Sequence, residues 1–380
     1  MISIKKIFSA VCAAALIFPC SVYVKAAKPG CEVSSWILTE QETGYVISEC
    51  NSDKRVPSGA LNKLMTALIA AEYIESGEIS MDTELTASEA AHTATGAVIW
   101  LDTGEKITAG ELMKALLIGN AGDAAVVFAE TIAGGCDEFT CLMNFRAAEL
   151  GMKNTFFTSP YAIDDDNQYT TAFDTALLTS EIASHEELRE IMLTWRDTVR
   201  GGKTETVNEN TLIRTYEGVN GVKAWHTEQS GYCAAVSAHR SGGKYTAVVL
   251  GSEDSEERFD FAKQLLKEGI SGYKTIIPGF SSEYMKPLKV KQGTEDSVIL
   301  NAENLSTLVI PKGTEDTLRI VTVSPDYIKA PVRKGQKIGT LAFYLDRTLL
   351  YETSLIAADS VPEKTFRKSF RKIIVKMFKE

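Results

Sequence analysis

The chain has 380 residues and a formal net charge of −10, and 44% of its residues are hydrophobic. This length and composition are ample for more than one packed domain, and the negative charge argues against nucleic acid as a partner. Within residues 1–26, Lys5 and Lys6 precede an apolar run over residues 7–18. This pattern predicts a secretory signal peptide. The alternative is an uncleaved anchor, although the apolar run is short for a membrane span.

Removal of residues 1–26 leaves an odd number of cysteines, Cys31, Cys50, Cys136, Cys141 and Cys233. At least one of them must then be unpaired or pair between chains. Cys31 with Cys50 and Cys136 with Cys141 are the candidate pairs, and the sequence leaves the pairing open. No C-x-x-C or His-x-x-x-His spacing indicates a metal site, and we expect no metal and no cofactor.

Local patterns then predict a mixture of strands and helices. Residues 32–50 are typical of two strands around a Thr-Gly turn. Residues 61–74 carry apolar residues at helical spacing, with Pro57 and Ser58 as entry signals. Two helical segments over residues 109–133 are separated near residues 118–122. Strands around 234–238 and 245–250 flank a turn at 241–243, and 256–267 is an amphipathic helix. We therefore expect an α+β layer arrangement over residues 27–275.

The pattern changes at about residue 276, where short apolar runs alternate with Gly, Pro and Asp. Residues 276–360 therefore predict a small all-β domain. Residues 361–380 form a predicted basic amphipathic helix with Phe and Ile on one face and Lys and Arg on the other. Such a helix can lie in an anionic membrane surface, and we expect residues 364–379 to do so. The alternative is a helix packed on the protein itself.

The stretch from residue 55 to residue 66 resembles a nucleophile motif without its nucleophile. In an S-x-x-K motif, the lysine lies on the same helix face as the serine and can take its proton. Here Lys63 is present, but the residue three before it is Ala60. Ser58 is the candidate for a displaced nucleophile, although it would lie about 140° round a helix from Lys63. The alternative role for Ser58 is a helix N-cap.

Several other segments carry the same family resemblance. The predicted hairpin at 36–47, residues 96–101 and 104–108, E-L-G-M-K-N-T at 149–155, and residues 169–174 and 330–335 resemble the D-alanyl-D-alanine carboxypeptidases. These are the low-molecular-mass penicillin-binding proteins. The resemblance implies a penicillin-binding (β-lactamase-like) first domain, a β-sandwich second domain and a C-terminal membrane anchor.

Two further motifs of that family are altered. At the position of the S-x-N motif, Asn120 stands for the serine and Gly122 for the asparagine. The Asn120 side chain can donate and accept hydrogen bonds, but it cannot relay a proton as a hydroxyl does. At the K-T-G position, Lys223 is kept, whereas Ala224 and Trp225 replace threonine and glycine. Trp225 could block the cleft or offer a flat surface to a ligand. Lys63 and Lys223 could attract a carboxylate, or could be structural remnants.

The sequence thus predicts an exported homologue at the outer face of the cytoplasmic membrane that has lost its chemistry. It would bind peptidoglycan stem peptides, through Lys63, Asn120, Lys223 and Trp225, or act as a scaffold for cell-wall enzymes. One alternative is an active serine-type carboxypeptidase that uses Ser58. Another is a purely structural protein whose cleft is closed by Trp225.

Overall fold

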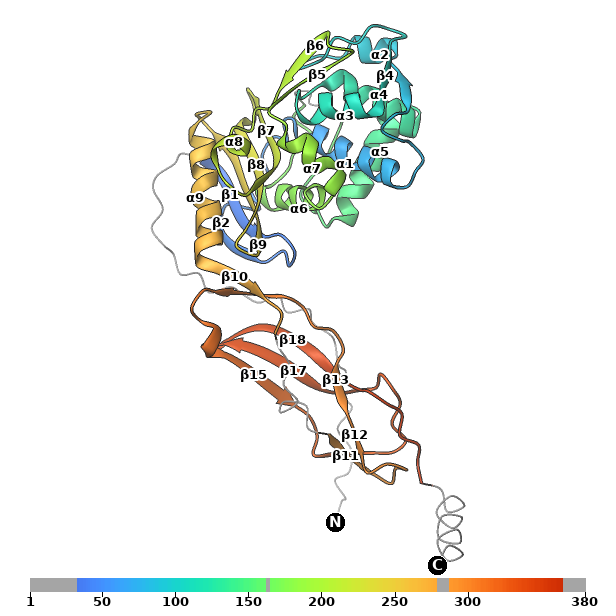
Figure 1. Ribbon diagram of the computed structural model, residues 1–380, viewed down its shortest axis with the longest axis vertical. Helices are drawn as coiled ribbons and strands as arrows, with labels where there is room; N and C mark the ends of the chain where they lie inside the picture. The colour runs from blue at the N-terminus through green and yellow to red at the C-terminus, as the bar shows by residue number, and fades with distance from the viewer. Residues whose placement is uncertain (1–32, 162–164, 279–286, 365–380) are drawn as a thin grey trace, which may run out of the picture. The chain divides into compact units, whose positions relative to one another are not determined.

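A computed structural model describes residues 33–161, 165–278 and 287–364 (Figure 1). Among these residues, one compact unit comprises those up to 278 together with 305–316, and the second comprises 287–304 and those from 317 onward. The expected boundary at 275/276 differs from this division, because residues 305–316 return to the first unit. The predicted signal peptide and nearly all of the predicted basic helix lie outside the described residues and stay predictions.

The first unit is built on a five-stranded antiparallel sheet with the order β2-β1-β9-β8-β7 (Figure 1). The strands are β1 Val33–Glu40, β2 Val46–Cys50, β7 Val219–Thr227, β8 Gly231–Arg240 and β9 Gly243–Ser252. The predicted turn between β8 and β9 places Ser241 and Gly242 at φ of 56° and 78°. A two-residue hairpin with both φ values positive follows the twist of its strands. The predicted strands of this sheet are therefore confirmed.

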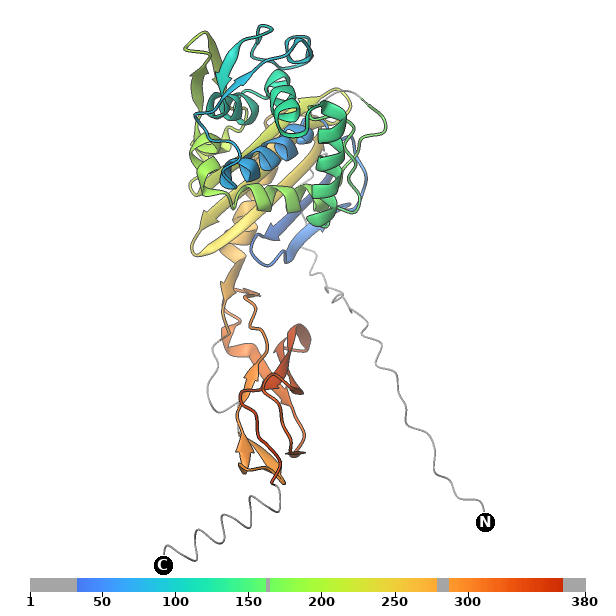
Figure 2. The ribbon, with the colours of Figure 1, turned by 90° about the vertical axis from the view of Figure 1, so that its right-hand side faces the viewer.

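Helices cover both faces of the sheet, which confirms the α+β class (Figure 2). Helix α6 packs on β1 and β9, and α9 packs on β1, β8 and β9. Alternate residues of β1 enter different cores: Ile37 joins the cluster that contains α1, while Trp36 and Leu38 join the cluster with α9. The helices are α1 Leu61–Glu75, α2 Glu89–His92, α3 Ala109–Leu117, α4 Gly122–Ala133, α5 Cys136–Glu149, α6 Ala172–Ile182, α7 Glu186–Leu193, α8 Leu212–Thr215 and α9 Glu257–Gly272.

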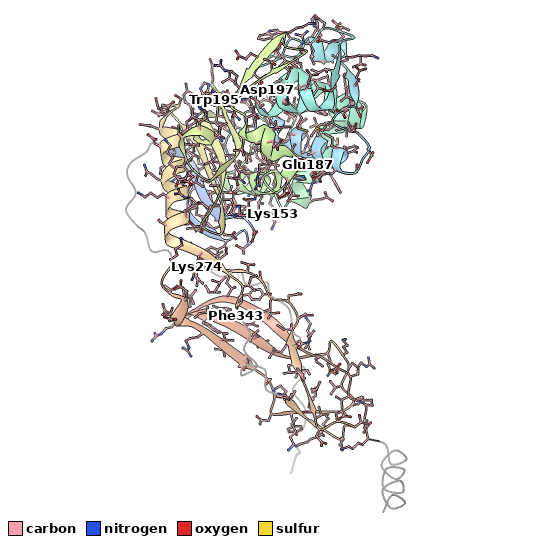
Figure 3. The ribbon with its side chains drawn as sticks, in the orientation of Figure 1. Lys153, Glu187, Trp195, Asp197, Lys274 and Phe343 are labelled. Carbon is pink, nitrogen blue, oxygen red and sulfur yellow. The ribbon has the colours of Figure 1, made fainter. Side chains whose placement is uncertain are left out.

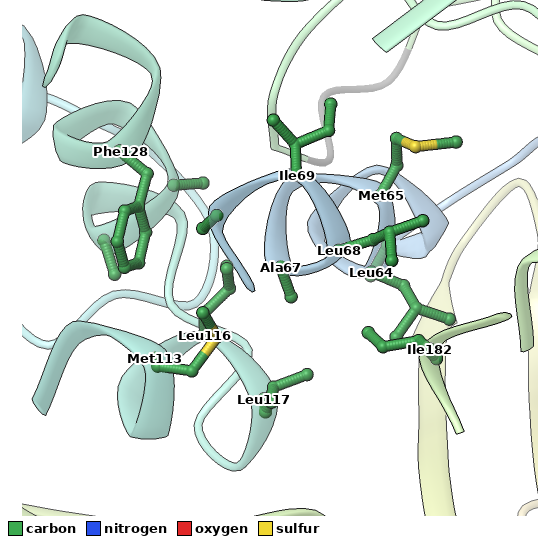
Figure 4. Close-up of a cluster of buried hydrophobic side chains, with 14 of the residues drawn as sticks. Leu64, Met65, Ala67, Leu68, Ile69, Met113, Leu116, Leu117, Phe128 and Ile182 are labelled. Atoms are coloured by element: carbon green, nitrogen blue, oxygen red, sulfur yellow. The ribbon is translucent and has the colours of Figure 1, made fainter. Parts of the chain in front are cut away.

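Helix α1 is the central helix of the larger core (Figure 4). All its residues from 61 to 71 are buried, so it is enclosed on every side rather than lying on a surface. Ala60 is the residue at its N-cap position and makes no side-chain cap. The expectation that Ser58 caps the helix is wrong, because its hydroxyl donates to Asn62 Oδ1 at 3.0 Å.

Three two-stranded ribbons complete the first unit. They pair β3 Glu84–Thr86 with β4 Lys106–Thr108, β5 Arg196–Val199 with β6 Thr204–Val207, and β10 Tyr273–Ile276 with β14 Leu308–Pro311. The β5–β6 ribbon is tied to α3 by an ion pair of 2.8 Å between Lys114 and Asp197, which is labelled in Figure 3. This ribbon leads directly into the loop that contributes Glu209 to the site described below.

The second unit is all-β, as predicted. Strands β12, β11 and β16 form one sheet, and β13, β18, β17 and β15 form another. Phe343 of β17 is fully buried (Figure 3). The strands are β11 Leu288–Lys291, β12 Ser297–Val298, β13 Leu300–Ala302, β15 Leu318–Val323, β16 Tyr327–Lys329, β17 Lys337–Leu345 and β18 Thr348–Ala357.

The candidate pair Cys136 and Cys141 is not joined by a disulfide in this structure. Both lie on α5 and both are free. Residues five apart lie about 140° apart round a helix, so their thiols diverge. Cys31, the candidate partner of Cys50, lies outside the described residues. Within the described ranges, no helix is long and apolar enough to span a bilayer.

Candidate functional site

The three motif positions converge where the start of α1, the junction between α3 and α4, and strand β7 meet. Lys63 lies in the first turn of α1 and is 3% exposed. Its ammonium donates to the backbone carbonyl of Asn120 in the α3–α4 junction. Burial lowers the pKa of Lys63 to about 8, while the attraction of Asp123 and Glu209 opposes this fall. Lys63 is therefore enclosed by the fold and already bonded.

Lys223 of β7 is buried as deeply as Lys63. Its Nζ donates to the carbonyl of Leu116 at 3.0 Å and to that of Leu117 at 3.4 Å, at the end of α3. Burial and the neighbouring charge of Lys63 together lower the pKa of Lys223 to about 7. The two lysines thus lie close enough to repel, and this repulsion, together with burial, favours the neutral form of Lys223 above about pH 7.

The S-x-N position forms the junction between α3 and α4. Asn120 has a φ of 55°, and its Nδ2 donates to Glu209 at 3.3 Å. Its Oδ1 is buried and has no hydrogen-bond partner within the described residues. Gly122 donates its N–H to Ala97 at 2.7 Å. A Cβ at Gly122 would lie only 3.3 Å from the Thr95 carbonyl, so the family's asparagine would fit only if this loop moved.

Asp123, the residue after Gly122, anchors the loop that contains Ile99 and Leu101. It is 1% exposed, and its carboxylate accepts the N–H groups of Ile99 at 3.0 Å and Leu101 at 3.2 Å. These bonds hold the loop that covers Gly122. A buried carboxylate with several N–H donors is a structural anchor as much as a counter-charge for Lys63.

Trp225 fills the space beside the nucleophile position. Strand alternation places Lys223 and Trp225 on one face of β7, whereas Ala224 joins the core under α9. The indole is 1% exposed. A Cβ on Gly59 would lie 2.9 Å from Trp225 Nε1, so the ring packs directly against the backbone before Ala60. In this structure Trp225 therefore offers no open face to a ligand.

Two residues that the sequence did not single out complete the site. Arg258 of α9 donates to the carbonyl of Trp225 at 2.7 Å and to that of Cys233 at 3.1 Å, which fixes the end of β7 against β8. Its guanidinium also lies 3.7 Å from the carboxylate of Glu209. Glu209 follows β6 in a loop, and no motif or periodicity marks it in the sequence.

Ser58 has a different set of partners from Lys63. It is fully buried and bonded to Asn62, whose Nδ2 donates to Ser159 at 2.8 Å and to Gln168 at 2.7 Å. The structure thus brings Lys63, Asn120, Lys223 and Trp225 together. It places the Ser58 hydroxyl in a network that runs through Asn62 to Ser159 and Gln168.

Comparison with known proteins identifies the family of the chain. Residues 23–254 match the family model described as D-alanyl-D-alanine carboxypeptidase, and residues 274–363 match the C-terminal domain of penicillin-binding protein 5. The chain is 32% identical over 340 residues to the D-alanyl-D-alanine carboxypeptidase DacF of Bacillus subtilis, covering 88% of this chain and 87% of that protein. The chain belongs to the D-alanyl-D-alanine carboxypeptidase family.

Solved structures extend the likeness to both units. Penicillin-binding protein 5 from Haemophilus influenzae matches with a TM-score of 0.81 and 27% identity, over 89% of this chain and 100% of the other. Penicillin-binding protein D2 from Listeria monocytogenes, solved in an ampicillin-bound form, matches with a TM-score of 0.56 and 28% identity. That match covers 64% of this chain and 98% of the other. The family fold is thus present.

Proposed function

We propose that this member of the carboxypeptidase family is catalytically inactive and serves peptidoglycan metabolism without chemistry, as an exported scaffold for cell-wall enzymes. The observation that carries the proposal is Ala60 at the nucleophile position with the Trp225 indole packed against Gly59 beside it. A methyl group forms no acyl-enzyme, and the indole occupies space that a substrate would need.

The magnitude of the chemical loss supports inactivity. In another serine hydrolase, removal of the nucleophile alone costs about 10⁶ in turnover. Here the hydroxyl of the second motif is also absent, because Asn120 stands in its place. An amide can hold a hydrogen bond but does not relay a proton.

The closed cleft favours a scaffold over a stem-peptide receptor. Lys63 and Lys223 donate to backbone carbonyls and are nearly inaccessible. A peptide ligand would have to displace Trp225 and open the loop above Gly122 before it reached either ammonium group. The outer surfaces of the fold need no such rearrangement to contact a protein.

Membrane attachment through residues 364–379 belongs to the same proposal. Seven basic residues lie in this segment: Lys364, Arg367, Lys368, Arg371, Lys372, Lys376 and Lys379. Each contributes on the order of 1 kcal/mol near an anionic surface, so together they could hold a protein of net charge −10. The signal-peptide pattern of residues 1–26 supports export, which places the protein beside the cell wall.

An active enzyme that uses Ser58 is the competing proposal, and the geometry supports it less. The Ser58 hydroxyl is buried and donates to Asn62, while Lys63 donates to Asn120. For Lys63 to serve as its base, both side chains would have to leave these partners.

The test is intact-protein mass spectrometry after incubation with ampicillin. We expect no adduct on the wild-type chain, and an adduct on an Ala60→Ser/Trp225→Gly variant that forms faster than on Ala60→Ser alone. A stoichiometric adduct on the wild type that disappears in Ser58→Ala would refute inactivity. Titration with a pentapeptide ending in D-Ala-D-Ala distinguishes a scaffold role from a stem-peptide receptor role. Saturable binding by the wild type would contradict the scaffold role.

A further inference from the structure

A second pocket lies in the first unit, and none of the three motif positions lines it. Its volume is about 430 Å³, within the range of about 300–1,000 Å³ that is typical of ligand sites. The turn between β1 and β2, the segment from α6 into α7, and the start of β7 supply most of its lining. Helices α6 and α7 pack against strands β7, β8 and β9 of the sheet (Figure 1). We call this cavity the α6–α7 pocket.

Hydrogen bonds between distant segments build one wall of the α6–α7 pocket. The side-chain amide of Gln41 donates to the Ser180 carbonyl at 3.1 Å and accepts from the Ser237 hydroxyl at 3.0 Å. The turn that follows Gln41 is held by Glu40, whose carboxylate accepts the N–H of Thr43 at 2.9 Å. The wall is therefore formed before any ligand arrives, as is usual for binding sites.

The side-chain amide of Asn220, on β7, lines the same pocket and is not used in this way. Asn220 is 9% exposed, and its Oδ1 is buried without a hydrogen bond to any residue that the structure describes. A buried polar atom without a partner costs free energy, which a ligand can recover by bonding to it. A primary amide has a donor side and an acceptor side, so it can complement the N–H and C=O groups of a peptide.

The charges around the pocket favour a ligand with a single negative charge. Arg189 of α7 lines the pocket and has no ion pair or hydrogen bond within the described ranges. Lys244, also in the lining, is already paired with Glu42 at 2.8 Å. Because Glu42, Glu181 and Glu186 all line the pocket, a multiply charged phosphate would be repelled. A free guanidinium suits a carboxylate, which it can bind through two parallel N–H groups.

The rest of the lining can accept an apolar side chain. Leu150, Leu177 and Ala183 contribute to it. The described lining residues include no aromatic ring on which a nucleobase could stack. A carboxylate, a peptide group and an apolar side chain occur together at the C-terminal end of a peptide. Capture of a C-terminal carboxylate is a recurring mode of peptide recognition.

We propose that the α6–α7 pocket binds the free C-terminus of a partner protein. The terminal carboxylate pairs with Arg189, the last peptide group bonds to the Asn220 amide, and the last side chain is apolar. This assignment rests on the proposed scaffold role, because a scaffold for cell-wall enzymes needs a site for a protein segment outside the closed motif positions. It uses no residue of those positions.

Fluorescence anisotropy of the full chain tests the pocket with a labelled L-peptide, Ala-Ala-Leu, that carries the dye on its N-terminus. The same peptide with a C-terminal carboxamide is the comparison. We expect the free acid to bind at least about tenfold more tightly than the carboxamide, because only the free acid forms a charge-assisted pair with a guanidinium.

Two substitutions on one turn of α7 should act in opposite directions. Arg189→Gln should abolish the preference for the free acid, whereas Arg189→Lys keeps the charge without the planar fork and should reduce the preference in part. Glu186→Gln removes a like charge and should tighten binding of the free acid by about twofold. Arg196→Gln is the matched control, because it changes the charge as Arg189→Gln does but lies outside the pocket lining, paired with Glu205. It should bind as the wild type does.

Three results would overturn the C-terminal site. They are no saturable binding of the free acid, equal affinity for the acid and the carboxamide, and a preference that persists in Arg189→Gln. Tighter binding of a peptide ending in D-Ala-D-Ala than of the L-peptide, lost in Arg189→Gln, would overturn the protein ligand in favour of a stem peptide. None of these results bears on catalysis, whereas a β-lactam adduct on the wild type would overturn only the proposed inactivity.

Discussion

Replacement of Lys223 by methionine should make the stability of the first unit less dependent on pH. The folded pKa of Lys223 is lowered from 10.5 to about 7, mainly by burial. Below pH 7 both folded and unfolded chains hold the proton, and the folded state bears the whole cost of a buried charge. Between about pH 7 and 10.5 the unfolded chain holds a proton that the folded chain has released, so stability rises with pH.

The fall in pKa corresponds to about 5 kcal/mol of unfolding free energy gained across that window. Lys223→Met removes this gain. It also leaves the carbonyls of Leu116 and Leu117 without their donor, which costs about 1–3 kcal/mol each at every pH. The unfolding free energy of the variant should therefore lie closest to that of the wild type at pH 6. By pH 10 it should fall several kcal/mol further below the wild-type value.

Urea unfolding at pH 6, 8 and 10, followed by tryptophan fluorescence, measures this difference. All four tryptophans, at positions 36, 100, 195 and 225, lie in the first unit, so the signal reports that unit alone. Lys267→Met, at an exposed position of α9, is the control and should change little with pH. A wild-type to Lys223→Met difference that stays constant from pH 6 to pH 10 would show that the ammonium is not desolvated as described.

Two further outcomes are expected. Arg258→Lys should lower the unfolding free energy of the first unit by about 1–3 kcal/mol in urea melts, because one ammonium cannot replace a guanidinium whose Nη1 donates to Trp225 and Cys233 while its Nε donates to Ser255; an unchanged midpoint would contradict this. Deletion of residues 361–380 should abolish sedimentation with anionic lipid vesicles, and the full chain should bind them less as salt rises; binding that survives the deletion would place the membrane contact elsewhere.

The sequence predicted elements whose signal is local. The hairpin of β1 and β2, helix α1 and the pair α3–α4 follow from alternation, helical spacing and turn residues within one window. The family resemblance supplied the position of β7, and with it the faces of Lys223 and Trp225. These residues could be placed because strand and helix periods decide which side chains share a face.

What escaped the sequence depends on contacts between distant segments. Glu209 is an acidic residue in a polar loop, and only the fold brings it to Asn120, 89 positions earlier. In the sequence, Arg258 fits the polar face of an amphipathic helix. In the fold, its guanidinium donates to backbone carbonyls of two strands, β7 and β8. Ser58 has the residue type of an N-cap, but its hydroxyl donates to Asn62, which itself bonds to the distant Ser159 and Gln168. In each case hydrogen bonds that involve distant segments prevail over a local preference.

Lys223 has a structural role that does not depend on catalysis. Helix α3 ends at Leu117, and the last carbonyls of a helix lack partners within it. Lys223 donates to two of them, those of Leu116 and Leu117, and so acts as a cap supplied by a strand. The negative end of the helix dipole favours a cation or a donor at this point. The proposed loss of catalysis would remove the need for a serine, but not the need to satisfy these buried carbonyls. Alanine at position 60 therefore has little structural cost. An apolar residue at position 223 would leave the buried carbonyls of Leu116 and Leu117 without a hydrogen-bond donor.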